Sequence, residues 1–148
     1  MDPIIGKLKT PEECKNLEDN ATRNGRLDLA MDARRRGIEL KALKHGATTD
    51  AERECIEAVY AYERVLSEKK GKNTPASRTW PMLKRWGIVP AVERIVSRKA
   101  ETSGYKALVD MGLQDFAFEA VVLRYPELFS AEAIAHSKAR MTEETSGQ

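Results

Sequence analysis

Basic side chains are concentrated in the middle of this 148-residue chain, where they could bind a polyanion. Residues 69–99 hold nine lysines and arginines and one acid, Glu93, which gives the segment a net charge of +8 in a chain whose total is +2. Such a surface attracts phosphates, because each phosphate that it neutralises releases condensed counterions. The basic residues of the stretch are Lys69, Lys70, Lys72, Arg78, Lys84, Arg85, Arg94, Arg98 and Lys99.

Two tryptophans lie within the same stretch and could add aromatic contacts. An indole ring can stack on a nucleobase or lie along a phosphate backbone. Trp86 shares a predicted helix face with Met82 and Leu83, so we expect it in the core. Trp80, next to Arg78, is the tryptophan that we expect to contact a ligand, with a lid over the core as its other interpretation.

The segment 79–96 resembles a helix-turn-helix. That motif joins a short helix, a glycine-containing turn and a second helix that enters the major groove. The chain departs from the pattern at Leu83, where a small residue is usual, and at Glu93, where an apolar one is expected. The resemblance implies a second helix beginning near Pro90. Its outward residues would be Glu93, Arg94, Ser97 and Arg98, and the residues that fit the pattern are Met82, Trp86, Gly87, Ile88 and Val96.

No catalytic residue, metal site or cofactor site is predicted. Residues 71–74 end like a phosphate-binding loop but lack its upstream glycine and a preceding strand. The cysteines, Cys14 and Cys55, lie far apart in helical segments, and only two histidines accompany them, so we expect core residues rather than a zinc site. His45 could act as a general base only if a carboxylate met it in the fold; the candidates are Glu39, Glu52 and Glu54.

Three function classes follow from these residues. The leading hypothesis is a non-catalytic nucleic-acid-binding domain, with DNA ahead of RNA, that works as a regulator or as the targeting domain of a larger assembly. The runner-up is a helical interaction module whose basic face docks an acidic protein or the acidic residues 100–148 of another copy, which carry a net charge of −4. The third is an enzyme that uses His45. A basic run can also be a solvated face without a partner.

The elements that must position these side chains are predicted to be helices, because apolar residues recur at three and four and nowhere alternate. Capping signals begin helices after Thr10 and Thr49, and glycines end helices at Gly46 and Gly71. Gly37 weakens the second helix and marks a possible break. The predicted helices are 11–24, 26–45, 50–70, a short one from 74 or 79 to 86, one from about 90, 103–111, 113–125 and 131–141.

These elements predict an all-α fold, a compact bundle of seven to eight helices. We expect one domain over residues 1–141, built from helical subdomains of about 10–71 and 74–141 that share a core, and a disordered tail over 142–148. We expect no signal peptide, because the first residues contain no long apolar run, and no apolar run in the chain approaches the ~20 residues of a membrane span. With two cysteines and no disulfide framework, we expect a reducing compartment and therefore the cytoplasm. The oligomeric state stays open.

Overall fold

The part of the chain that the structure describes is helical throughout. The computed structural model describes the backbone of residues 3–98 and 103–146 and the side chains of residues 3–98 and 104–142. Within these ranges there are eight α-helices, three short 3-10 helices and no strand. The prediction of an all-α bundle with seven to eight helices is confirmed.

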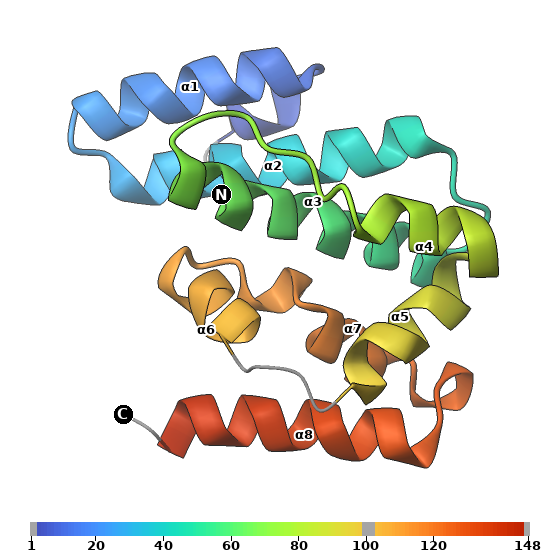
Figure 1. Cartoon of the computed structure of the whole chain (residues 1–148). Coiled ribbons are helices and arrows are strands. Elements are labelled where there is room, and N and C mark those ends of the chain that lie inside the picture. The colour runs from blue at the N-terminus through green and yellow to red at the C-terminus, as the bar shows by residue number, and fades with distance from the viewer. Residues whose placement is uncertain (1–2, 99–102, 147–148) are drawn as a thin grey trace. The chain divides into compact units, whose positions relative to one another are not determined.

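The helix bounds follow the sequence signals closely (Figure 1). The α-helices are α1 Pro11–Arg23, α2 Leu27–His45, α3 Asp50–Lys70, α4 Thr79–Trp86, α5 Ile88–Ser97, α6 Ser103–Asp110, α7 Phe118–Arg124 and α8 Ala131–Ser146. The 3-10 helices are η1 Ile5–Lys7, η2 Gln114–Phe116 and η3 Pro126–Leu128.

Both predicted capping signals are used. The Thr10 hydroxyl accepts from the Glu13 amide at 3.1 Å, and the Glu13 carboxylate accepts from the Thr10 amide at 3.0 Å, which is a complete capping box. At α3 the Thr49 hydroxyl accepts from the Glu52 amide, but the Glu52 carboxylate accepts from Thr48, one residue further back. These bonds, the Thr48 hydroxyl first, lower the pKa of the Glu52 carboxyl. The glycines predicted to end α2 and α3 both have left-handed backbone.

The helices form two compact units, residues 1–46 and 47–148. In the first, α1 packs along α2, and a Cβ added at Gly37 would stand 3.3 Å from the Cβ of Cys14. A small residue there lets the two helices approach closely, and α2 passes Gly37 without the break that we considered. The apolar core of this unit is Ile5, Leu8, Cys14, Ala21, Leu29, Ala30, Ala33 and Leu40, with Leu17 against it.

The boundary between the units falls earlier than the predicted one. The sequence predicts that the two subdomains divide near residues 71–74, directly after α3. The structure groups α3 with the helices that follow, because its apolar stripe packs against α5, α6 and α7. Helix length changes near residue 70, but the burial of that stripe decides the grouping.

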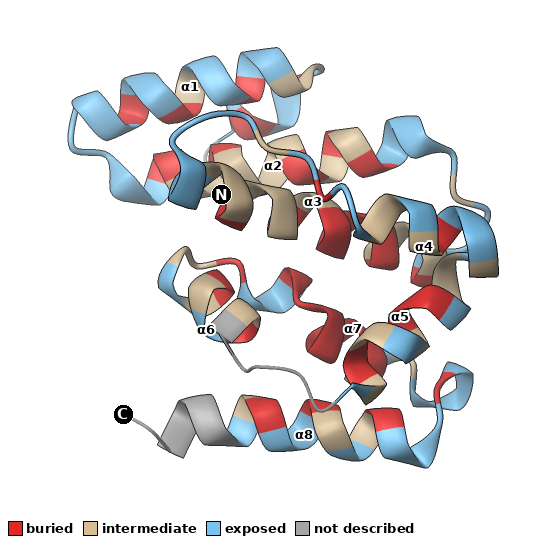
Figure 2. Ribbon diagram, in the orientation of Figure 1, coloured by how far each residue is buried: buried red, intermediate tan, exposed pale blue. Residues whose placement is uncertain are grey.

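The second unit has three layers, with α3 on one side, α5, α6 and α7 in the middle, and α8 on the other side (Figure 1). Helix α7 is buried all round at residues 118–122, as its sequence predicted (Figure 2). It is shorter than expected, because extended backbone at Ala117 separates it from η2. Residues 113–125 are therefore two short helices rather than one.

A buried ion pair joins two of these layers. The Arg140 guanidinium of α8 donates to the Glu119 carboxylate of α7 at 2.9 Å, with both side chains about nine-tenths buried. A second nitrogen of Arg140 donates to the carbonyl of Arg98, just past the end of α5. One buried arginine thus fixes α7, α8 and the end of α5 together.

The last helix is longer than predicted. Helix α8 continues to Ser146, where the sequence analysis ended it at Met141 and expected a disordered tail. No proline or glycine interrupts the chain until Gly147, so nothing in the sequence stops the helix earlier. Residues 147–148 of the expected tail lie outside the described residues.

The cysteines are core residues, as predicted. Cys14 and Cys55 are buried and free. Burial raises the pKa of the Cys14 thiol, and it raises that of Cys55 to about 12. None of the described helices has the length and apolarity that crossing a membrane requires.

Two substitutions one turn apart on α8 should change stability in opposite directions. The Ser137 hydroxyl is fully buried without a hydrogen-bond partner, so Ser137→Ala should raise the free energy of unfolding by about 1 kcal/mol. Arg140→Ala should lower it by about 3 kcal/mol, because Glu119 would be left buried and unpaired. Urea unfolding measures both, and a destabilised Ser137→Ala variant would contradict the assignment of an unpaired hydroxyl.

Candidate nucleic-acid interface

The basic stretch folds into two separate groups of side chains. Lys69 and Lys70 lie in the last turn of α3 and Lys72 follows it; we call these three residues the lysine end. The loop 71–78 then returns along α3. The Thr74 amide donates to the Ser67 hydroxyl at 2.9 Å, and the Ala76 amide donates to the Glu63 carboxylate at 2.8 Å.

The second group is carried by α4 and α5, from the N-cap of α4 to the residue just past the end of α5, and we call it the basic corner. Its members are Arg78, Lys84, Arg85, Arg94 and Arg98. Helix α4 begins beside the middle of α3, because Trp80 contacts Tyr60. From Tyr60 to the end of α3 at Lys70 is about 15 Å along the helix axis, at a rise of about 1.5 Å per residue. The lysine end therefore lies well apart from the start of α4 along α3 (Figure 1). All eight of these cations are exposed, and Lys99 lies outside the described residues.

Trp80 is tied to α3 rather than open to a ligand. Its indole nitrogen donates to the Glu63 carboxylate at 2.6 Å, and its ring lies 5.0 Å from that of Tyr60 at an angle of 58°. The same carboxylate holds Ala76, so Glu63 fixes both the loop and the start of α4. Sequence reasoning missed Glu63, because it precedes the basic stretch by six residues and no motif marks it.

Trp86, expected in the core, is only half-buried and lies among cations of the basic corner. The guanidinium carbon of Arg94 is 4.2 Å from the centre of its ring, and that of Arg85 is 5.0 Å away. Both distances fall within the range of cation–π attraction. The spacing of Trp86 and Arg94 crosses a helix break, so no helical periodicity could have paired them.

The junction of α4 and α5 departs from a helix-turn-helix. A single residue, Gly87, separates the helices, and its φ of 91° is a conformation that side chains disfavour. The motif joins its helices through three or four residues. Helix α5 begins at Ile88, two residues ahead of the expected start near Pro90. The geometry of the junction therefore does not support recognition by a helix placed in the major groove.

Glu93 is part of the scaffold. Its carboxylate accepts from the Ser97 hydroxyl at 2.7 Å and from the amide and hydroxyl of Ser130, both at 2.8 Å, directly before α8. Burial opposes the ionisation of Glu93, but these three hydrogen bonds outweigh it and lower the pKa of its carboxyl. Of the four residues expected to face outward on α5, Arg94 and Arg98 are exposed, while Glu93 and Ser97 join α5 to α8.

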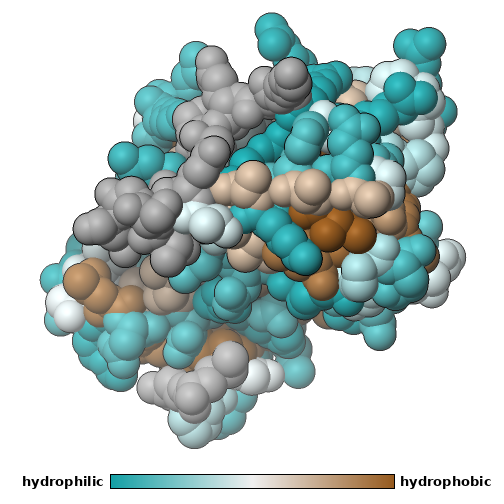
Figure 3. Space-filling view, turned by 90° about the horizontal axis from the view of Figure 1, so that it is seen from below, coloured by the Kyte–Doolittle hydropathy of each residue, from teal (hydrophilic) through white to brown (hydrophobic). Residues whose placement is uncertain are grey.

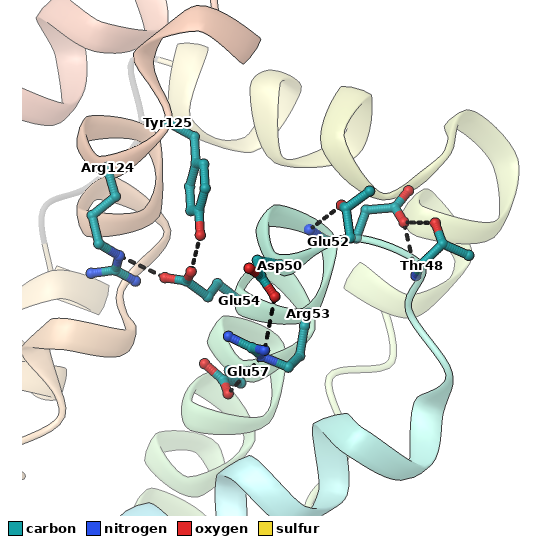
Figure 4. Close-up of polar contacts among 9 residues, drawn as sticks. Thr48, Asp50, Glu52, Arg53, Glu54, Glu57, Arg124 and Tyr125 are labelled. Carbon is teal, nitrogen blue, oxygen red and sulfur yellow. Dashed lines mark hydrogen bonds and ion pairs between the residues drawn. The ribbon is translucent and has the colours of Figure 1, made fainter.

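A carboxylate network at the first turns of α3 shows how charges elsewhere in this unit are satisfied (Figure 4). Glu54 accepts from the Arg124 guanidinium at 2.6 Å and from the Tyr125 hydroxyl. The bond to Glu54 raises the pKa of Tyr125 to about 12, so this phenol stays protonated as a donor. The network joins α3 to the end of α7.

Two further arginines outside the basic stretch also pair with acids. Arg53 pairs with Asp50 at 3.1 Å and with Glu57 at 3.7 Å, and Arg34 of the first unit pairs with Glu18 at 3.0 Å. In the described part of the chain, the eight cations of the lysine end and the basic corner form no ion pair with an acid. Two of the acids near them along the chain, Glu63 and Glu93, hold backbone and serine groups instead.

Helix ends explain part of this arrangement. Lys69 and Lys70, Lys84 and Arg85, and Arg94 each lie in the last turn of a helix, where the helix dipole favours cations. The gain is roughly 0.3–1 kcal/mol for each. It offsets the repulsion among like charges without neutralising them.

The enzyme hypothesis gains no assembled site. His45 is exposed in the last turn of α2, and two of its suggested partners, Glu52 and Glu54, already accept hydrogen bonds from Thr48 and from Arg124 with Tyr125. Among the described residues, no group of three or more histidines, cysteines and acids is arranged to hold a metal ion.

Comparison of the chain with protein-family models, with curated proteins and with solved structures gives no match.

The hydrogen bonds of Glu93 predict a pH-dependent difference between wild type and Glu93→Gln. Because the folded pKa is lowered, the stabilisation by Glu93 is complete above the ordinary value of 4.5 and disappears as the pH falls through the lowered pKa. Wild type should exceed the variant by about 1 kcal/mol at neutral pH, and the gap should close in acid. Thermal unfolding across this range measures it. Glu127→Gln, at an exposed acid, is the control and should show no such gap.

Trp80→Phe should separate structure from binding at the start of α4. The variant loses the indole hydrogen bond to Glu63, so the free energy of unfolding should fall by about 1 kcal/mol. Binding of nucleic acid by the folded variant should equal that of wild type. Urea unfolding and fluorescence-anisotropy titration give the two quantities. Loss of binding in a variant that remains folded would contradict this prediction and would show that Trp80 contacts the nucleic acid.

Proposed function

We propose that this protein is a non-catalytic nucleic-acid-binding domain that contacts phosphates through the basic corner. The observation that carries the proposal is the contrast in pairing. Four arginines elsewhere in the described residues each hold an acid at ion-pair distance, while the exposed cations of this corner have no such partner there. Like charges gathered without partners destabilise a folded protein, so a polyanionic ligand gives them a function.

The contacts that we propose are with the nucleic-acid backbone. Phosphate contacts fix the position of a protein but carry no base sequence. Glu93 and Ser97 are joined to Ser130, so they are unavailable to read bases from α5. We therefore propose binding with little sequence preference. The sequence favours DNA over RNA only through the resemblance of residues 79–96, which the junction of α4 and α5 does not support, so the proposal covers both DNA and RNA.

The lysine end has a secondary role in this proposal. Lys69, Lys70 and Lys72 are exposed but separated from the basic corner along α3, so they add long-range attraction rather than a share of the same contacts. A domain that binds phosphates without chemistry suits a regulator, or the targeting part of a larger assembly. With its two cysteines free, we place it in the cytoplasm.

A protein partner is the second candidate. Residues 100–148 carry a net charge of −4, and Asp110, Glu127 and Glu132 are exposed in the same unit as the basic corner. Basic and acidic faces of two copies could pair through these residues. In Figure 3, hydrophilic side chains dominate the face shown and apolar surface appears in separate patches, so the docking that we consider is electrostatic.

Binding of labelled duplex DNA, single-stranded DNA and RNA across ~50 to ~300 mM salt tests the proposal. Five phosphate contacts predict a slope of about −4.5 in a plot of log affinity against log salt for duplex DNA. Arg85→Glu/Arg94→Glu should weaken binding by about tenfold or more at low salt. The dissociation constant should be the same at every protein concentration used, as expected when a single copy of the protein binds the nucleic acid.

Lys106→Glu/Lys138→Glu is the matched control. It makes the same change in net charge at exposed cations of α6 and α8, outside both basic groups. Equal losses of affinity in the two double variants would mean that only the net charge of the protein matters, which would contradict a specific contact surface at the basic corner. If wild type binds no nucleic acid at ~50 mM salt and sedimentation shows association that rises with its concentration, the interaction module replaces the proposal.

A further inference from the structure

Two guanidinium groups from different helices contact one indole ring at the basic corner. Arg85 comes from α4 and Arg94 from α5, and both lie within 5.0 Å of the centre of the Trp86 ring. Their guanidinium carbons are therefore at most about 9 Å apart, close enough for both to contact the phosphates of one short stretch of strand.

The backbone holds this arrangement in place. The Gly87 amide donates to the Leu83 carbonyl at 2.9 Å, and the one-residue turn brings the end of α4 against the start of α5. A Cβ at Gly87 would lie 3.6 Å from Cδ of Pro90 in a conformation that favours glycine. Glu93 joins α5 to Ser130, as described above, so the helix that carries Arg94 is fixed from its other side.

The role of Trp86 follows from what already lies on it. Two guanidinium groups already lie within cation–π distance of this ring, where they compete with a nucleobase that would stack on it. An arginine stacked on an aromatic ring keeps its N–H donors at the edge, where they can form paired hydrogen bonds to a phosphate. It also loses less side-chain freedom when it binds, because the ring has already restricted it.

We propose that Arg85 and Arg94 form a phosphate-binding pair that is pre-arranged by Trp86, and that Trp86 is a positioning residue rather than a base-stacking one. The ligand group is the backbone phosphate of a nucleic-acid strand, so the inference rests on the proposed function and specifies its contact. Recognition at this pair depends on guanidinium geometry as well as on charge, and it requires no base.

The first test compares two substitutions that keep the charge. Arg94→Lys removes the planar group from the Trp86 ring, while Arg98→Lys makes the same change four residues later, just past the end of α5, where no aromatic contact occurs in the described residues. Titration of a labelled single strand and of a duplex should show about fivefold weaker binding for Arg94→Lys, and a clearly smaller loss for Arg98→Lys, which keeps its charge and has no ring contact to lose. Equal effects of the two changes would overturn the proposal.

The second test separates positioning from stacking. Trp86→Leu is titrated with a single-stranded oligonucleotide and with an abasic phosphodiester strand of the same length. We expect about tenfold weaker binding to both strands, with the salt dependence nearly unchanged because the cations remain. Loss confined to the strand that carries bases would make Trp86 a stacking residue and overturn the proposal.

Controls keep the two proposals distinguishable. Circular dichroism and thermal unfolding establish that each variant is folded; if Trp86→Leu fails to fold, the comparison of Arg94→Lys with Arg98→Lys decides. A wild-type protein that binds neither strand nor duplex at ~50 mM salt removes the proposed function and this inference together. Wild-type binding that all three variants retain removes only the inference.

Discussion

The second unit depends on the burial of α7 between α3 and α8. Residues 118–122 have no solvent-facing side, so this helix is stable only inside a shell of other helices. Its one buried acid, Glu119, then requires a partner of opposite charge, and Arg140 of α8 supplies it. Arg140 also donates to the Arg98 carbonyl, so the same side chain holds the end of α5 against α7 and α8.

Two acids near α4 and α5 bind groups of the scaffold within the described residues and not the cations around them. Glu63 and Glu93 stand among cations, yet their carboxylates bind backbone amides, serine hydroxyls and an indole. Among the described residues, Glu63 and Glu93 form no ion pair with the cations of the basic corner. The fold therefore stabilises the scaffold around α4 and α5 while leaving their cations exposed, which is the condition that binding to a polyanion needs.

Within that scaffold, the two tryptophans have different surroundings, and only Trp86 departs from the core position expected for it. Trp80 is satisfied by Glu63 and Tyr60 and belongs to the framework. Trp86 is half-buried beside Arg85 and Arg94 and belongs to the basic corner. Both tryptophans lie on one eight-residue helix, so their difference comes from what packs against each side of α4.

The sequence by itself determined the helices, most of their ends and the charge of residues 69–99, because caps, glycine stops and apolar periodicity act over a few neighbouring residues. Contacts between distant segments decided the rest. The return of loop 71–78 along α3 separates the lysine end from the basic corner, and one glycine with positive φ sets Arg94 on Trp86. The binding of Glu63 and Glu93 to groups 13 to 37 residues away has no local signal. Such pairings depend on which surfaces meet when the core is buried, and only the tertiary structure decides that.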